Sequence, residues 1–166
     1  MTDSIESIGK IAHLNKDDYD QILAELEQFW GDAGIETIST QHSSMLFYEF
    51  GDTAFVIREG NQVIAYLFGL VSQTEPTGYV HLIAVREDYR RKGLAKSLYA
   101  HFEGTVRARG CKGLKAIAMP WNEVSIKFHQ SVGLEPVGIP DANGKKVIKG
   151  YRGPGKDRVV LRKSWD

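Results

Sequence analysis

The spacing of the apolar residues changes within Tyr79–Tyr99, and this change constrains the fold more than any other feature of the chain. Tyr79–Val85 is an apolar run of strand length that ends in a charged turn. Over Gly93–Arg109 apolar residues recur at every fourth position, which is typical of one face of a helix, and Gly110 is suited to end that helix. A strand that leads directly into an amphipathic helix predicts a layered structure of helices and a sheet.

The segment before this change predicts an N-terminal strand followed by helices. Ile5–Leu14 is a candidate first strand, and Asn15 is a suitable N-cap for a helix that we expect to continue to Gly31. Thr37–Phe50 is less regular and predicts a short helix. The side chains of this segment that we expect to face inward are Met45, Leu46 and Phe50.

The remaining elements predict a mixed sheet. Two strand-like runs, Thr53–Arg58 and Val63–Val71, flank a hairpin turn at Glu59–Asn61. Val63–Val71 is too apolar to have one face in water, so we expect it to be a central strand. The later elements are a strand at Leu114–Met119, a helix between Asn122 and Gly133, and short strands at Leu134–Val137 and Arg158–Arg162, joined by a polar connection over Gly138–Asp157. Hairpins followed by strand–helix alternation predict a mixed sheet, and a length of 166 residues predicts one domain over residues 1–166.

The composition restricts the class of protein and its partners. The chain has 21 Lys and Arg against 21 Asp and Glu, so no overall field attracts it to nucleic acid or to an anionic membrane. The single cysteine, Cys111, excludes an intrachain disulfide and the common zinc-ribbon clusters, and we expect no metal site. The longest apolar run, Val63–Val71, is too short to span a bilayer. No secretory signal is visible at the N-terminus, so we expect a cytoplasmic protein.

The residues that open the predicted helix form a candidate anion site. The first backbone N–H groups of a helix have no intrahelical partner, and the helix dipole adds partial positive charge there. Gly93 and Ala95 are small enough for a phosphate to approach the backbone, and Arg90, Arg91 and Lys92 add three cations. Basic residues at a helix start oppose the dipole unless an anion compensates them. Taken alone, these residues also fit the alternative of a solvated basic turn.

This segment resembles the acetyl-CoA-binding motif of the GNAT superfamily of N-acetyltransferases, Arg/Gln-x-x-Gly-x-Gly/Ala after an apolar strand, with Arg90 at its first position. Asn122–Leu134 resembles the second cofactor motif of that superfamily, Asn-x-x-[Ser/Ala]-x-x-Phe-Tyr-x-x-x-Gly-Phe. Both motifs have the order and spacing of the superfamily, and the phosphate-binding patterns G-x-x-x-x-G-K-[ST] and G-x-G-x-x-G do not occur. The chain is identified as a member of this superfamily, similar to bacterial members with unassigned substrates.

The resemblance implies a fold and a cofactor. The fold is α/β of the α+β type, with a mixed, mostly antiparallel sheet of about six or seven strands, splayed between the fourth and fifth and flanked by about four helices. The cofactor is acetyl-CoA, with its pyrophosphate on the helix start and its pantetheine arm along the end of the preceding strand. The implied cofactor-binding residues are Ile83, Ala84, Val85, Arg90, Arg91, Lys92, Gly93, Leu94, Ala95, Lys96, Asn122, Ser125 and Phe128. By residue type alone, Asn122 is also an ordinary N-cap and Phe128 an ordinary core residue.

The implied reaction is acetyl transfer to a primary amine by direct attack in a ternary complex, and its proton transfers indicate candidate catalytic residues. An alkylamine with a pKa of about 10.4 is mostly protonated at neutral pH, so a base must remove its proton. His81 is the candidate base, and Tyr79, on the same face of the strand, is expected to shape the pocket. His129 stands where the superfamily usually has tyrosine and is the candidate acid that protonates the leaving sulfur. The backbone N–H of Ile83 is a candidate oxyanion donor. A structural role is the alternative for each histidine.

The acceptor amine is expected to be a small molecule or a peptide. Residues 141–157, which include Tyr151 and Arg152, are long enough to close over it. Further candidates for the acceptor groove, by position alone, are His42, Glu49 and Gln73. Members of the superfamily are often dimers, so the resemblance is compatible with a homodimer. Nucleic-acid and membrane partners are not expected. A non-catalytic acyl-CoA-binding or sensing module is the alternative function, and a nucleic-acid binder that uses Arg90–Lys96 is a third.

Overall fold

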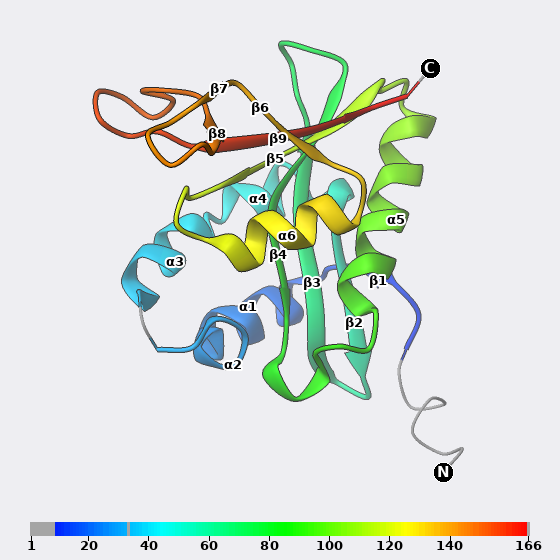
Figure 1. Cartoon of the computed structure of the whole chain (residues 1–166). Helices are drawn as coiled ribbons and strands as arrows, with labels where there is room; N and C mark the ends of the chain where they lie inside the picture. The colour runs from blue at the N-terminus through cyan, green and yellow to red at the C-terminus, as the bar shows by residue number, and fades with distance from the viewer. Residues whose placement is uncertain (1–8, 33, 166) are drawn as a thin grey trace. The chain divides into compact units, whose positions relative to one another are not determined.

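The computed structural model describes residues 9–32 and 34–165 (Figure 1). The chain divides into two compact units, each of which has its own buried side chains. The first unit holds the described residues of Met1–Leu70 and His81–Thr105, and the second those of Val71–Val80 and Val106–Asp166. The expectation of one domain over residues 1–166 stays a prediction.

In the described part of the chain, seven strands form one sheet in the order β1-β2-β3-β4-β5-β9-β6. Their bounds are Ala12–His13 (β1), Ala54–Glu59 (β2), Gln62–Val71 (β3), Thr77–Val85 (β4), Gly113–Ala118 (β5), Glu135–Val137 (β6) and Val159–Ser164 (β9). β4 and β5 are parallel, with Thr77–Val80 in register with Gly113–Ala116. The β1–β2, β2–β3, β5–β9 and β6–β9 pairs are antiparallel. The predicted mixed, mostly antiparallel sheet is confirmed, and the splay expected between β4 and β5 stays a prediction.

The helices before β2 are α1 (Lys16–Ala24), α2 (Leu26–Trp30), α3 (Ile35–Gln41) and α4 (Met45–Tyr48). The Asn15 side chain accepts the Asp18 N–H at 2.9 Å, and the Asp18 carboxylate accepts the Asn15 N–H at 2.8 Å, which confirms the predicted N-cap. The single helix predicted up to Gly31 is wrong, because Glu25, with φ −121° and ψ 27°, separates α1 from α2. Of the first strand predicted at Ile5–Leu14, residues 5–8 lie outside the described residues.

The segment Thr37–Phe50 holds the end of α3 and all of α4 rather than one short helix. Leu46 is 5% exposed, as expected for an inward side chain, whereas Met45 is 53% exposed, so its predicted inward orientation is wrong. A helix of four residues makes barely one turn, and it can therefore direct only about one side chain to the core. Phe50 is half-buried.

The β2–β3 hairpin lies at the centre of the first unit. Every residue of Val63–Phe68 is 0% exposed, so both faces of β3 are covered and the prediction of a central strand is confirmed. Side chains of β2, β3 and β4 form one core cluster with those of α1, α2 and α4. Helix α5 (Leu94–Ala108) also approaches β3 closely, because a Cβ atom at Gly69 would lie 2.4 Å from the Phe102 ring. Glycine at this position therefore permits the contact.

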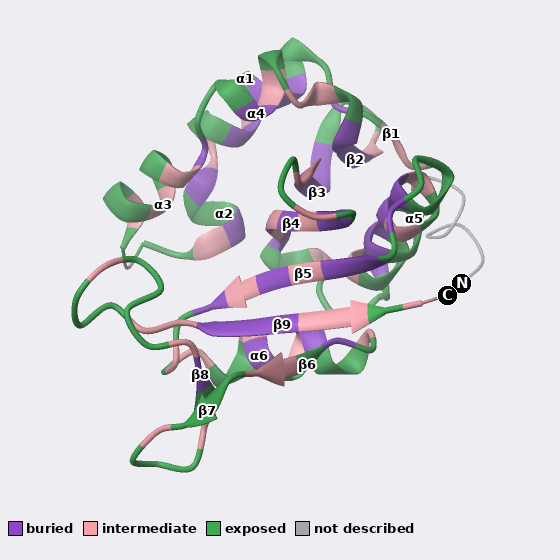
Figure 2. Ribbon diagram, turned by 90° about the horizontal axis from the view of Figure 1, so that it is seen from above, coloured by how far each residue is buried: buried purple, intermediate pink, exposed green. Residues whose placement is uncertain are grey.

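In the second unit, β5, β9 and β6 lie side by side with α6 (Glu123–Ser131) near them (Figure 2). The Asn122 Oδ1 atom accepts the Ser125 N–H at 3.2 Å and caps α6, as predicted. The polar connection over Gly138–Asp157 contains a small hairpin that was not expected, formed by β7 (Ile139–Pro140) and β8 (Lys146–Val147). Its turn is closed by Asp141, whose carboxylate accepts the N–H groups of Asn143 and Lys145.

Residues 9–32 and 34–165 contain no helix that is long and apolar enough to cross a membrane. These residues also hold no group of three or more His, Cys, Asp or Glu side chains placed to bind a metal ion. Cys111 is 4% exposed, and burial raises the pKa of its thiol, so it is a weak nucleophile at neutral pH.

Candidate functional site

Strand β4 presents one half-buried face along its length. The half-buried residues are Tyr79, His81, Ile83 and Val85, and those between them, Val80, Leu82 and Ala84, are buried. The half-buried side chains therefore share one face of the strand, as the alternation predicts. The strand ends at Val85, where the chain turns toward α5.

The turn after β4 is anchored by Arg86, a residue that the sequence motifs did not indicate. Arg86 is 6% exposed, its Nε atom donates to the Val63 carbonyl at 3.0 Å, and its backbone N–H donates to the Ile64 carbonyl at 2.8 Å. Its guanidinium also forms an ion pair with Glu25. Because a buried charge needs partners, these bonds hold the end of β4 to β3. One arginine in a charged turn carries no sequence signal for this role.

Arg90, predicted to bind the cofactor, directs its side chain toward two carbonyl groups of the protein. Its Nε atom donates to the Val85 carbonyl at 3.3 Å, and its Nη2 atom donates to the Phe29 carbonyl at 2.8 Å. Phe29 lies in the last turn of α2, where a cation is favoured by the helix dipole. In this geometry Arg90 supports the loop, and its contact with the cofactor stays a prediction.

The backbone between Arg90 and α5 has an unusual conformation. Arg91 has a φ of 64° and Gly93 a φ of 78°, so both are left-handed. This conformation costs a non-glycine residue about 1–2 kcal/mol, and such strain is often found at binding sites. α5 begins at Leu94, and the Gly93 carbonyl accepts the Ser97 N–H at 3.0 Å. The first N–H groups of α5 have no intrahelical partner, so the loop offers backbone donors to an anion.

The exposed side chains at this loop are basic. Among residues 90–96 the exposed ones are Arg90, Arg91, Lys92, Gly93 and Lys96, whereas Leu94 is buried and Ala95 half-buried. The Lys92 ammonium lies 5.1 Å from the centre of the Tyr89 ring. A Cβ atom at Gly93 would meet no atom within 4 Å, so space is open beside the backbone at this point. The loop therefore combines backbone donors, positive charge and open space, and its binding of a phosphate stays a prediction.

The four residues of the second motif lie on or beside α6. Ser125 and Phe128 are half-buried, and the Phe128 and His129 ring centres are 5.5 Å apart. The N-cap interpretation of Asn122 is confirmed, and its contact with a cofactor stays a prediction. Burial lowers the pKa of His129 to about 4, so its ring is neutral at neutral pH. A neutral imidazole lacks the extra proton of an efficient acid, so the acid role of His129 requires its surroundings to change when substrate binds.

His81 is held at the C-terminal end of α3. Its Nε2 atom lies 3.2 Å from the Gln41 carbonyl oxygen. A carbonyl oxygen only accepts, so Nε2 carries the hydrogen and Nδ1 is the basic atom of the neutral ring. His42, a positional candidate for the acceptor groove, is 2% exposed and belongs to the core instead. Burial lowers the pKa of His42, and the charge of His81 would lower it further.

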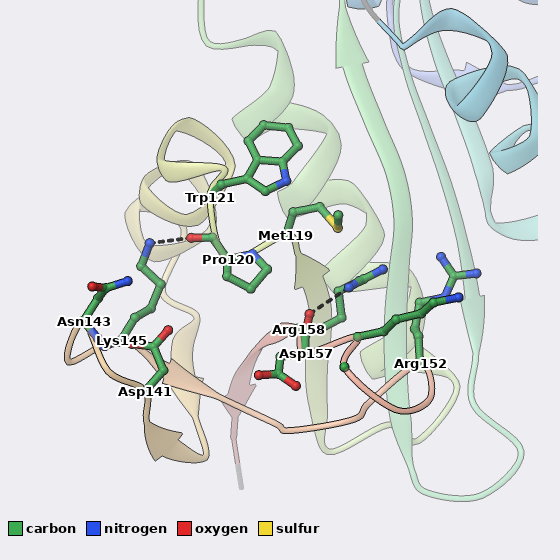
Figure 3. A pocket seen from close by; sticks show the side chains of 11 residues that line it. Met119, Pro120, Trp121, Asp141, Asn143, Lys145, Arg152, Asp157 and Arg158 are labelled. Carbon is green, nitrogen blue, oxygen red and sulfur yellow. Dashed lines mark hydrogen bonds between the residues drawn. The ribbon is translucent and has the colours of Figure 1, made fainter.

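Tyr79 and a pocket belong to the second unit. Burial, and to a smaller extent Tyr151, raise the pKa of Tyr79 to about 12, although Arg152 opposes this rise. Tyr79 is therefore neutral at neutral pH and lies within electrostatic reach of the connection over Gly138–Asp157. This connection lines a pocket of about 780 Å³, whose other wall is Met119, Pro120 and Trp121 (Figure 3). The sequence analysis indicated that residues 141–157 could line a binding site, but it did not indicate Met119, Pro120 or Trp121. Their part in the pocket depends on contacts with a distant segment, which a local sequence pattern does not show.

A family model described as Acetyltransferase (GNAT) family matches residues 17–134. The match includes both predicted cofactor motifs. The chain belongs to the GNAT acetyltransferase family. It is 31% identical over 94 residues to the aminoglycoside N(6')-acetyltransferase type 1 of Acinetobacter genomosp. 13. These 94 residues are 57% of this chain and 63% of that protein. The chain thus matches less than two thirds of the length of this relative.

Solved GNAT structures share the fold at low sequence identity. The PaiA N-acetyltransferase of Thermoplasma acidophilum, in complex with coenzyme A, has a TM-score of 0.70 and 13% identity, with 96% of this chain and 99% of that chain covered. The ribosomal-protein-S18-alanine N-acetyltransferase of Escherichia coli has a TM-score of 0.65 and 17% identity, with 93% and 92% covered. These two similarities establish the fold and leave the acceptor open.

Proposed function

We propose that the chain transfers an acetyl group from acetyl-CoA to a primary amine, by direct attack in a ternary complex. The observation that carries this proposal is the loop Arg91–Gly93, where two left-handed residues lead into the first N–H groups of α5 just after the half-buried end of β4. Membership of the GNAT family supports it, as does the coenzyme A bound to the PaiA enzyme.

The residues at this loop fit the chemical groups of coenzyme A. Backbone N–H groups of Arg91–Ala95 suit a pyrophosphate, and Lys96 adds a positive charge. Backbone groups of Ile83–Val85 suit the amides of the pantetheine arm, which would lie along the strand. Further proposed contacts on α6 are Asn122, Ser125 and Phe128. Acetyl-CoA supplies the acetyl group as a thioester whose thiol, with a pKa of about 8.5, leaves readily.

The chain must then remove a proton from the ammonium form of the acceptor. We propose His81 for this step, because the Gln41 carbonyl fixes Nε2 as the protonated atom and Nδ1 can accept the proton, directly or through water. Tyr79, whose pKa is about 12, keeps its hydroxyl proton and shapes the pocket. The Ile83 N–H is the proposed oxyanion donor, and His129 the proposed acid for the leaving sulfur.

The acceptor and the cellular setting belong to the same proposal. The equal numbers of basic and acidic residues, 21 each, support a small-molecule or peptide amine as the acceptor rather than a nucleic acid. A cytoplasmic location is part of the proposal, and so is a homodimer, which is proposed on the family resemblance. Cell fractionation tests the first, and light scattering of the purified chain tests the second.

Release of free thiol from acetyl-CoA, in the presence of a panel of primary amines, tests the proposed reaction. We expect release that depends on the amine, and an acetylated product by mass spectrometry. Coenzyme A binding without turnover of any amine would instead favour a non-catalytic acyl-CoA sensor. Salt-dependent binding of DNA or RNA that coenzyme A does not displace would favour the nucleic-acid alternative.

A further inference from the structure

The pocket of the second unit has two kinds of wall. On one side the chain leaves β5 through Met119, Pro120 and Trp121, and then enters the cap of α6 at Asn122. Trp121 is 72% exposed, and so it presents a large apolar surface to whatever enters. In Figure 3, Arg152 and Arg158 lie on one side of these residues, and Lys145 and Asn143 on the other.

The ionisable side chains that line the pocket carry a positive excess. The basic residues are Lys145, Arg152, Lys156 and Arg158, and the acidic residues are Asp141 and Asp157. Both carboxylates accept hydrogen bonds from backbone N–H groups of the connection over Gly138–Asp157. Asp141 accepts the N–H groups of Asn143 and Lys145, and Asp157 accepts the Gly150 N–H at 2.9 Å. These bonds hold the loop conformation, and the four basic side chains that line the pocket outnumber the two acidic ones.

Two of the basic residues are engaged by the protein, and two are available. Lys145 is bound to the Pro120 carbonyl and to Glu123, and Arg158 Nη1 donates to the Asp157 carbonyl at 2.7 Å. Within residues 9–32 and 34–165, the side chains of Arg152 and Lys156 form no hydrogen bond or ion pair with the protein, and both are exposed. Arg152 also lies near enough to Tyr79 to lower the pKa of that hydroxyl, which burial raises to about 12. One of the two available cations, Arg152, thus lies near Tyr79, the residue proposed to shape the acceptor site.

We propose that this pocket selects acceptor amines that also carry an anionic group, a carboxylate or a phosphate, which Arg152 and Lys156 bind while Trp121 covers the apolar part of the molecule. The inference rests on the proposed function, because it names the class of acceptor for that reaction. Arginine and lysine both bind carboxylate and phosphate, and arginine does so with a planar fork of donors. A polycationic acceptor would meet like charges here, so this chain is expected to disfavour aminoglycosides, in contrast to the name of its Acinetobacter relative.

Four acceptors of matched length test the selection. They are 4-aminobutanoate, 3-aminopropylphosphonate, the neutral 4-aminobutanamide and the dication 1,4-diaminobutane. We expect kcat/KM to be highest for one or both anionic amines, lower for the amide and lowest for the diamine. Comparison of 4-aminobutanoate with 3-aminopropylphosphonate shows whether a carboxylate or a phosphonate is preferred. Equal rates for all four, or a preference for the diamine or for an aminoglycoside, would overturn the inference.

A variant of one available cation, Arg152, locates the effect. Arg152→Glu is expected to lower kcat/KM for the preferred anionic amine about fivefold, with little change for the neutral amide, since an exposed charge pair contributes about 1 kcal/mol. Lys149→Ala removes an exposed lysine of the same connection that does not line the pocket, and it should change neither rate. A loss shared equally by the anionic and neutral amines would contradict the inference.

The two proposals fail in distinguishable ways. If the chain acetylates only amines that lack an anionic group, the acceptor class is wrong and the acetyltransferase activity stands. If no amine promotes thiol release, the proposed function is wrong, and the acceptor class that rests on it is overturned as well.

Discussion

The hydroxyl oxygen of Tyr66 lies 2.8 Å from the Nε2 atom of His42. The His42 Nδ1 atom lies 2.7 Å from the Ile38 carbonyl oxygen, so Nδ1 carries the hydrogen and Nε2 is the acceptor. Tyr66 therefore donates to His42, and it accepts the Trp30 indole N–H at 2.7 Å. Only a neutral His42 permits this arrangement, which holds the ends of α2 and α3 to β3 within the first unit.

Removing the Tyr66 hydroxyl should destabilise the protein. In Tyr66→Phe the Trp30 N–H and the His42 Nε2 atom both lose a buried partner, and we expect the free energy of unfolding to fall by about 1–3 kcal/mol. Urea denaturation measures this change. Tyr48→Phe is the matched control, because Tyr48 is 62% exposed and its variant should unfold like the wild type. Equal stability of the two variants would show that the hydrogen-bonded chain contributes nothing.

Acid should destabilise the protein through its buried histidines. Burial lowers the pKa of His42, and lowers that of His129 from 6.5 to about 4. Above about pH 6.5 neither state binds the proton, whereas below it the unfolded state does and the folded state does not. The free energy of unfolding should therefore fall as the pH drops from about 6.5 toward 4, by at most about 1.4 kcal/mol per unit for each histidine.

The contribution of His129 to this pH dependence can be isolated. Denaturation of the wild type and of His129→Phe at several pH values should show a shallower acid loss for the variant, by roughly 3 kcal/mol in total at pH 4. The difference between the two proteins removes the contribution of carboxylates, which both share. Parallel pH profiles would contradict a neutral, buried His129.

Two glycines of this segment, Gly93 just before α5 and Gly104 within it, should respond oppositely to alanine. A Cβ atom at either position would meet nothing within 4 Å, so packing does not decide the outcome. Gly93 has a φ of 78°, which costs alanine about 1–2 kcal/mol. Gly104 lies within α5, where alanine is favoured by about 1 kcal/mol. We expect thermal unfolding to occur at lower temperature in Gly93→Ala and at higher temperature in Gly104→Ala. An unchanged or raised unfolding temperature in Gly93→Ala would exclude the left-handed loop.

His81 should control the acid limb of the rate profile. If it is the base, His81→Ala should lower kcat/KM by about 10²–10⁴-fold and remove the dependence on pH at the acidic side. Gln41→Ala is the control, since the contact with His81 uses the backbone carbonyl, which this variant keeps. An unchanged profile in His81→Ala would assign the proton transfer to another group.

The sequence predicts the parts of the fold that depend on local chemistry. Asn15 and Asn122 cap their helices as predicted, because an N-cap needs only a side-chain acceptor and the next few N–H groups. Val63–Val71 is a central strand as predicted, because a run without polar residues has no face for water. The change of apolar spacing at Tyr79–Tyr99 likewise places β4 and α5 within a few residues of their bounds.

The parts that the sequence could not predict depend on contacts between distant segments. The direction of the Arg90 side chain is set by the Phe29 carbonyl, 61 residues away in the chain. Burial of His129, and hence its neutral ring, follows from tertiary packing rather than from its neighbours in the motif. The pocket beside Trp121 likewise needs the small β7–β8 hairpin, whose strands of two residues give almost no pattern.

Docking of a nucleotide diphosphate on the loop between β4 and α5 is tested most directly by titration calorimetry with desulfo-CoA, which binds without reacting. The wild type should give a saturable heat. Gly93→Ala should bind about tenfold more weakly, because alanine disfavours the left-handed loop by about 1–2 kcal/mol. The absence of a saturable heat in the wild type, or the same affinity in both proteins, would contradict the assignment of this loop as the cofactor site.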